Sequence, residues 1–123
     1  MEDRPRNSIG TLRWFTQAGL GILLVILLSV HLIVNHLVAP QGLLSYADVI
    51  HYYDVPGIAL MEILFLAVVT VHCLLGLYSI LLDLNLPSPK FKNTLTWLLV
   101  ILGVIAVAYG TYLTWAISAA PTP

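Results

Sequence analysis

The segment GIALMEILFLAVVTVHCLLGLYSILLDL, residues 57–84, decides the fold of this chain. It is apolar almost throughout, and it is longer than the roughly 20 residues that an α-helix needs to cross the hydrocarbon core of a bilayer. Two further apolar runs flank it, over residues 14–39 and 95–119. We therefore predict an all-α membrane protein with three transmembrane helices at about residues 14–39, 57–84 and 95–119.

The composition agrees with a bilayer environment. Of 123 residues, 59% are hydrophobic and only 9% are charged, and the mean hydropathy is +0.94. A soluble domain of this size could not cover so much apolar surface. Residues 1–123 read as a single transmembrane domain without repeats, and the net charge of −1 gives no reason to expect nucleic acid as a partner. The single cysteine, Cys73, excludes a disulfide framework within the chain, so metal chemistry must use histidine or a partner's ligands.

The five basic residues predict the orientation. Arg4, Arg6 and Arg13 precede the first apolar run, and Lys90 and Lys92 lie between the second and the third. By the positive-inside rule, the N-terminus lies in the cytoplasm and the C-terminus outside. The first run is too long for the core of a cleavable signal peptide. We expect a multi-pass protein of the cell's inner (cytoplasmic) membrane that retains its first helix.

The two connections differ in character. The first, residues 40–57, has tyrosines but no lysine or arginine, and we expect an interfacial turn or short helix at the outer face. In the second, residues 85–93, Pro87 and Pro89 are expected to stop the preceding helix.

A polar or small stripe marks the second predicted helix. At 100° per residue, His72, Gly76, Ser79 and Asp83 fall on one narrow face. A histidine within the membrane is costly unless it faces protein, water or a metal, and a nearby glycine leaves room for a flat group. From position alone, His72 is a haem ligand, a proton relay or a hydrogen-bonded packing residue, and Asp83 is a functional acid or a solvated charge at a helix end.

The other histidines are less clearly placed. His31 and His36 lie about 140° apart around the first helix, so they cannot face the same group. The depth of His31 allows it to share one site with His72 or to form a second. His36 and His51 read as ordinary solvated or hydrogen-bonded histidines near the outer interface. Glu62 is a snorkelling acid or an internal partner, to which we assign no chemistry.

The third helix reads as structural. Gly103, Ala106 and Gly110 form a ridge of small residues that suits close packing against another helix.

These motifs together resemble the small cytochrome b membrane-anchor subunit of succinate dehydrogenase or fumarate reductase, respiratory complex II. The family's second helix carries a histidine, a glycine four residues later and an aspartate eleven residues later, which His72, Gly76 and Asp83 match. Gly110 fits the glycine of the third helix. The segments SVHLIV and AGLGILLVILL, both in the first run, resemble the corresponding family segments, so the likeness extends over most of residues 14–117.

The resemblance implies cofactors and partners. His72 would be an axial ligand of haem b shared with a larger cytochrome b anchor subunit. In relatives with two haems, the histidine of the first helix can supply the second axial ligand, which makes His31 a candidate for that role. Ubiquinone or menaquinone would bind beside Asp83, with Gly76 and Ser79 on the same stripe. The chain would hold an iron–sulfur subunit and a flavoprotein subunit at the bilayer, and would not be catalytic alone.

Three positions of this sequence depart from the family pattern, and they weaken the assignment of quinone-binding residues in particular. Leu84 replaces a tyrosine that usually follows the aspartate, Tyr78 replaces an arginine, and Gln17 stands where many relatives have arginine. Two other classes stay open: a cytochrome b anchor of another oxidoreductase, such as a hydrogenase or formate dehydrogenase, and a haem-free assembly or small transport subunit. Four histidines, two of them peripheral, are few for the former.

Overall fold

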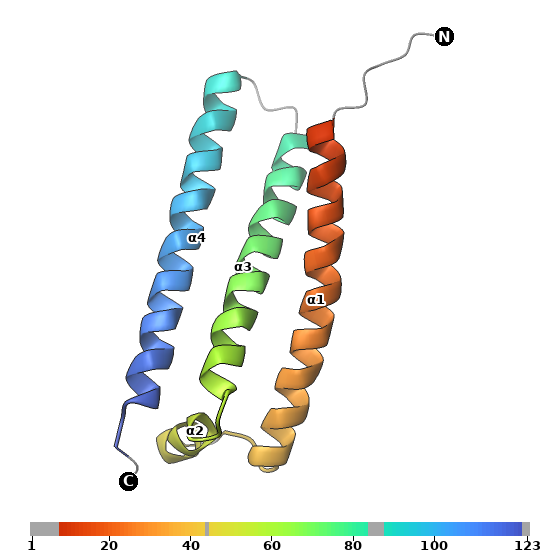
Figure 1. The fold of residues 1–123 in the computed structure, drawn as a ribbon. Helices are drawn as coiled ribbons and strands as arrows, with labels where there is room; N and C mark the ends of the chain where they lie inside the picture. The colour runs from red at the N-terminus through yellow and green to blue at the C-terminus, as the bar shows by residue number, and fades with distance from the viewer. Residues whose placement is uncertain (1–7, 44, 84–87, 122–123) are drawn as a thin grey trace.

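The computed structural model describes residues 8–43, 45–83 and 88–121, and this part of the chain is almost entirely helical. Its helices are α1 (Ser8–Val38), α2 (Tyr46–Tyr53), α3 (Ile58–Asp83) and α4 (Pro89–Ser118). Three of them, α1, α3 and α4, are long and apolar enough to cross a membrane. They run side by side with α3 in the middle, and α2 lies across one end (Figure 1). The prediction of an all-α protein with three candidate transmembrane helices is confirmed.

Two predicted helix starts were wrong because helices continue past the edge of an apolar run. α1 begins at Ser8 rather than near residue 14, and α4 begins at Pro89 rather than near residue 95. Ser88 caps α4, since its hydroxyl oxygen accepts from the backbone N–H of Phe91 at 3.3 Å, and proline suits the first helical position. Pro89 therefore starts a helix instead of ending one, whereas Pro87 lies outside the described residues.

The first connection contains the short helix that its sequence allowed. Ser45 and Asp48 form a capping box at the start of α2: the Ser45 hydroxyl oxygen accepts from the Asp48 backbone N–H, and the Asp48 carboxylate accepts from the Ser45 backbone N–H. Gly57, with φ of +88°, then adopts the left-handed conformation that lets the chain turn from α2 into α3.

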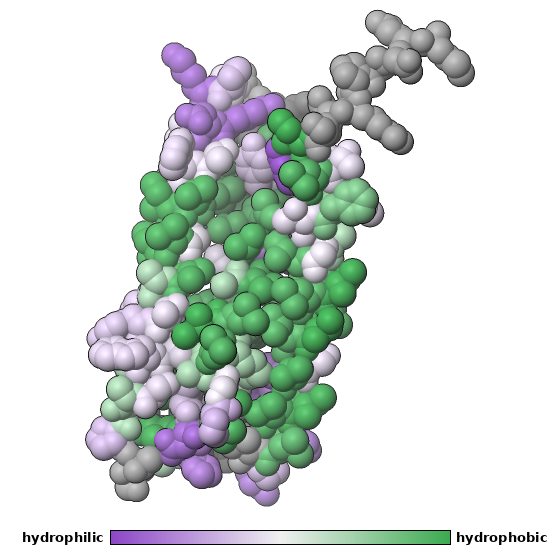
Figure 2. Space-filling model, viewed as in Figure 1, coloured by the Kyte–Doolittle hydropathy of each residue, from purple (hydrophilic) through white to green (hydrophobic). Residues whose placement is uncertain are grey.

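Few side chains are buried within the described part of the chain. The most buried are Tyr52 and Ile50 of α2, at 2% and 3% exposure. Most large apolar side chains of the long helices point outward. Figure 2 shows apolar residues along the middle of the molecule and polar residues gathered at its two ends. Such a surface suits lipid or further helices rather than water.

Glycines on α4 allow close packing against α3. A Cβ atom at Gly103 would meet the side chains of Leu74 and Thr70, and one at Gly110 would meet Leu66. Both glycines of the predicted ridge therefore face α3, whereas Ala106 is exposed.

Candidate functional site

His72 lies near the middle of α3 and faces α1. A Cβ atom at Gly21 of α1 would stand 3.3 Å from Cε1 and 3.8 Å from Nδ1 of the His72 ring. Gly21 thus lets the imidazole approach the α1 backbone. Nδ1 is buried without a hydrogen-bond partner, and the ring makes no hydrogen bond within the described residues. A buried polar atom without a partner is costly, so the His72 nitrogen that faces α1 has a hydrogen-bonding capacity that the described residues do not satisfy.

Gln17 connects α1 to the same turn of α3. Its Nε2 donates to the backbone carbonyl of His72 at 3.1 Å, while its Oε1 is buried without a partner. A Cβ atom at Gly76 would stand 3.1 Å from that Nε2. The clearance beside Gly76, which we expected to receive a flat group, is therefore taken by the Gln17 amide in this structure, because α1 packs there.

Sequence reasoning missed the roles of Gln17 and Gly21 in this contact. The two residues are one turn apart on α1, as His72 and Gly76 are on α3. That matched spacing of a polar and a small residue was the available signal. The spacing does not reveal which face of α1 packs against which face of α3, so the contact could be identified only from the structure.

The other two residues of the stripe lie toward the end of α3. The Ser79 hydroxyl donates to the backbone carbonyl of Leu75 at 2.9 Å. Asp83 is exposed at the last position of α3, and it forms no ion pair with any residue that the structure describes. Ser79 is exposed as well, so this end of the stripe is open to a partner or ligand.

His31 belongs to a separate cluster. Its Nδ1 lies 2.8 Å from Oε1 of Glu62, and its Nε2 lies 3.5 Å from Nδ2 of Asn35. The ring also stacks on Phe65, with centroids 5.4 Å apart. In the tautomer that these contacts favour, Nδ1–H donates to Glu62 and Nε2 accepts weakly from Asn35.

Tyr52 brings α2 into this cluster. Its hydroxyl donates to the same Glu62 oxygen at 2.6 Å. Burial, and then the hydrogen bond to Glu62, raise the pKa of Tyr52 well above its ordinary value, so it stays a donor. Glu62, whose side chain is 15% exposed, is therefore the internal partner that the sequence left as one of two alternatives.

The two candidate histidines lie at different depths. His72 is eleven residues from the end of α3, or about 16 Å along the helix. His31 is seven residues from the other end of the bundle on α1, or about 10 Å. They therefore occupy two places rather than one. His36 and His51 are both exposed, as expected for ordinary histidines.

The comparison with protein families decides the assignment. Residues 4–112 match the model described as "Succinate dehydrogenase/Fumarate reductase transmembrane subunit". The chain belongs to this family. It is 32% identical over 115 residues to the succinate dehydrogenase hydrophobic membrane anchor subunit of Archaeoglobus fulgidus, which covers 94% of this chain and 97% of the relative. It is 28% identical over 123 residues to the anchor subunit of the same name from Thermoplasma acidophilum, covering 100% and 99%. No solved structure matches.

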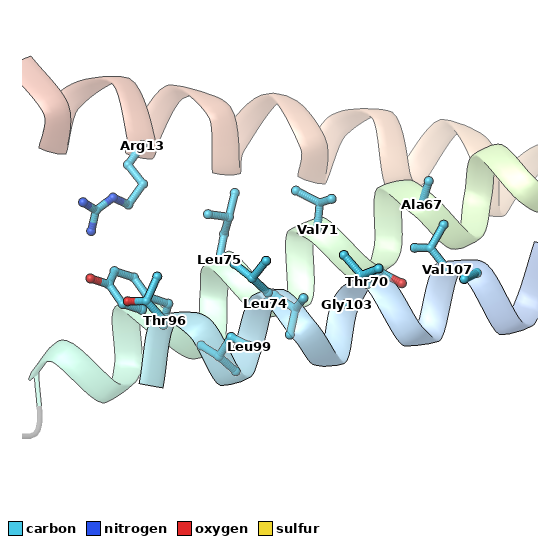
Figure 3. Close-up of a pocket in the computed structure, with 14 residues that line it drawn as sticks. Arg13, Ala67, Thr70, Val71, Leu74, Leu75, Thr96, Leu99, Gly103 and Val107 are labelled. Carbon is cyan, nitrogen blue, oxygen red and sulfur yellow. The ribbon is translucent and has the colours of Figure 1, made fainter. Parts of the chain in front are cut away.

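This membrane anchor subunit also has a concave surface that His72 does not line. A groove of about 820 Å³ runs along α3 and α4 and reaches Arg13 of α1. Figure 3 shows the Arg13 side chain extending toward the groove at the end where Thr96 lies. Arg13 stands over the Tyr78 ring, with its guanidinium carbon 5.2 Å from the ring centroid. We call this surface the Arg13 groove.

Proposed function

We propose that this anchor subunit contributes to haem b and quinone binding in a succinate:quinone oxidoreductase, and helps pass electrons from the iron–sulfur subunit to quinone. The environment of His72 carries the proposal: its ring is partly buried beside Gly21 and has no hydrogen-bond partner in the described chain. One nitrogen of a neutral imidazole can bind iron while the other donates to a nearby acceptor. An optical spectrum of the purified complex is the first test.

The residues around His72 fit a ligand role. A bound haem b would supply a one-electron carrier within the bilayer. Gln17 holds the backbone at His72 through the carbonyl bond, and Gly21 leaves room for the ring. The Oε1 of Gln17 is also buried without a hydrogen-bond partner among the described residues. A histidine of the larger anchor subunit would supply the other protein ligand of the haem iron.

His31 is a candidate ligand for a second haem. A carboxylate on one ring nitrogen is a common outer partner of metal-binding histidines, and Glu62 has that relation to Nδ1. Nε2 would remain for iron, but it would have to give up its 3.5 Å contact with Asn35. One haem requires only His72, whereas two haems require this rearrangement as well.

The open end of the stripe is our candidate for the quinone site. Asp83 and Ser79 are exposed there, where a hydroxyl and a carboxylate can orient a quinone or a water molecule. Reduction of quinone consumes protons as well as electrons, so an acid at the membrane edge can assist by hydrogen bonding.

Asp83→Leu is expected to lower quinone reductase activity by roughly 10- to 100-fold, the loss of one charge-assisted hydrogen bond in the reaction. Succinate oxidation with a soluble artificial acceptor should stay near the wild-type rate, because that route bypasses the membrane site. Both activities are measured on the purified complex. If both activities stay at wild-type values, Asp83 is only a solvated charge at a helix end and has no role in quinone reduction.

The orientation can be tested independently of the cofactors. We propose that the N-terminus and the connection before α4 lie in the cytoplasm, since Arg13, Lys90 and Lys92 are at that end of the helices. A reporter that is active only outside the cytoplasm should be active when fused at the C-terminus and inactive when fused after Lys92. The reverse pattern would overturn the orientation and, with it, the cytoplasmic quinone site.

The family match supports a proposal about the partners of this chain. An anchor subunit of succinate dehydrogenase implies catalytic subunits and a membrane. We propose a flavoprotein subunit, an iron–sulfur subunit and a larger cytochrome b anchor, and a role in the tricarboxylic acid cycle. Their co-purification with this chain, with each subunit identified, is the corresponding test. The family match favours this complex over a hydrogenase or a formate dehydrogenase.

A further inference from the structure

We propose that the Arg13 groove binds one anionic phospholipid, with a hydrocarbon chain along α3 and α4 and the phosphate at Arg13. The proposal concerns a surface separate from His72, and it does not depend on the haem or quinone assignments. Four features of the groove carry it: its length, its lining, its charge and the side of α3 on which it lies.

The length of the groove fits one leaflet. Its lining on α4 extends from Thr96 to Ala108, which corresponds to about 18 Å along a helix. The hydrocarbon core of a bilayer is about 30 Å thick, so one leaflet accounts for about 15 Å. A transmembrane helix of a partner would need a contact surface over the whole core. The groove instead ends near mid-bilayer, as a lipid chain does.

The residues that line the groove suit a hydrocarbon chain along its length and a polar group at the end where Arg13 lies, which we call the mouth. Most of the lining side chains are aliphatic. The Thr96 hydroxyl, near the mouth, already donates to the backbone carbonyl of Lys92 at 2.9 Å. At the mouth, Arg13 and Tyr78 make no hydrogen bond within the described residues, and Thr70 is a further polar residue of the lining that lies deeper in the groove (Figure 3). A volume of about 820 Å³ lies within the ordinary range of ligand sites.

The charge at the mouth is positive. Arg13 has no carboxylate partner among the described residues, and Lys92 lies one turn from Thr96. The acid at this end, Asp83, is about 140° around α3 from Tyr78, so it belongs to another face. A guanidinium pairs with phosphate through two charge-assisted hydrogen bonds, which are about twice as strong as neutral ones. A phosphate therefore fits Arg13 better than a neutral quinone carbonyl does.

The test uses the purified complex, stripped of lipid and titrated with phosphatidylglycerol or phosphatidylcholine that have the same chains. Native mass spectrometry counts the lipids bound to each. We expect one site per anchor chain that prefers phosphatidylglycerol by about fivefold, the effect of one basic residue near the surface. Arg13→Gln should abolish this preference. An unchanged preference in Arg13→Gln would overturn the proposal.

A matched pair on α4 tests the groove itself. Val100 lines the groove and Ile101 does not, and they are similarly exposed, at 47% and 53%. Val100→Phe should lower lipid occupancy at this site several-fold, whereas Ile101→Phe should leave it unchanged. Equal occupancy in the two variants contradicts the proposal.

Two further measurements test the alternative occupants. Added ubiquinone that displaces the bound phosphatidylglycerol one for one would assign the groove to quinone. A Val104→Cys side chain that cross-links to the larger anchor subunit in membranes would assign it to a partner helix. Either result overturns the lipid assignment, and the absence of both supports it.

Discussion

A His72→Ala complex is expected to lose the absorption band of a b-type haem, or to show it strongly shifted. Of the two candidate ligands, His72 and His31, only His72 has a ring without a hydrogen bond to the described residues, and alanine offers iron no donor. Haem content should fall by at least half, measured as the haem-to-protein ratio of the purified complex. Assembly should weaken as well, because a haem shared by two subunits stabilises their association.

His36→Ala and His51→Ala are the matched controls for this result. Both histidines are exposed and lie far from His72 along the helices, so both variants should keep the wild-type haem spectrum. A normal spectrum and stoichiometry in His72→Ala would refute the ligand assignment. That result would favour the alternative of a haem-free subunit, in which His72 only packs against α1.

His31→Ala separates one haem from two. A partial loss of haem would indicate a second site that uses His31, and an unchanged haem content would indicate one site. The structure makes the second outcome the simpler one, because both nitrogens of His31 already have contacts within the chain.

The sequence was sufficient for the fold because the bilayer imposes strong constraints. Apolar runs longer than a membrane-spanning helix leave few alternatives, and the short polar connections force neighbouring helices to run in opposite directions. The boundaries were less accurate. Residues 8–13 and 89–94 are polar enough to fall outside an apolar run, yet nothing in them stops a helix. Polarity marks the edge of the membrane, whereas caps mark the end of a helix.

The candidate site was only partly predictable. Periodicity correctly grouped His72, Gly76, Ser79 and Asp83 on one face of α3, since that depends on a single helix. It gave no information on rotation or register between helices. The contact of Gln17 with the His72 carbonyl, and that of Glu62 with both His31 and Tyr52, depend on how α1, α2 and α3 meet.

Glu62→Leu is expected to loosen α2 from the long helices. The Glu62 carboxylate is the acceptor for two donors, the His31 ring at 2.8 Å and the Tyr52 hydroxyl at 2.6 Å. Leucine would leave both without an acceptor in a partly buried place, at a cost of about 1–3 kcal/mol for each unpaired group. Tyr52 is 2% exposed, so its hydroxyl cannot easily turn to water instead.

The effect of Glu62→Leu should be local as well as global. Hydrogen exchange of the α2 amides should become faster by about tenfold or more, since about 1.4 kcal/mol corresponds to a factor of ten, and the purified complex should unfold at a lower temperature. Glu62→Gln keeps a carbonyl oxygen that can accept the same bonds, so it should remain closer to the wild type. Tyr52→Phe removes one of the two donors and should fall between Glu62→Gln and Glu62→Leu. If α2 exchanges at the wild-type rate in Glu62→Leu, the side chains of Ile50 and Tyr52 hold α2 in place by packing alone, and the shared carboxylate contributes nothing measurable.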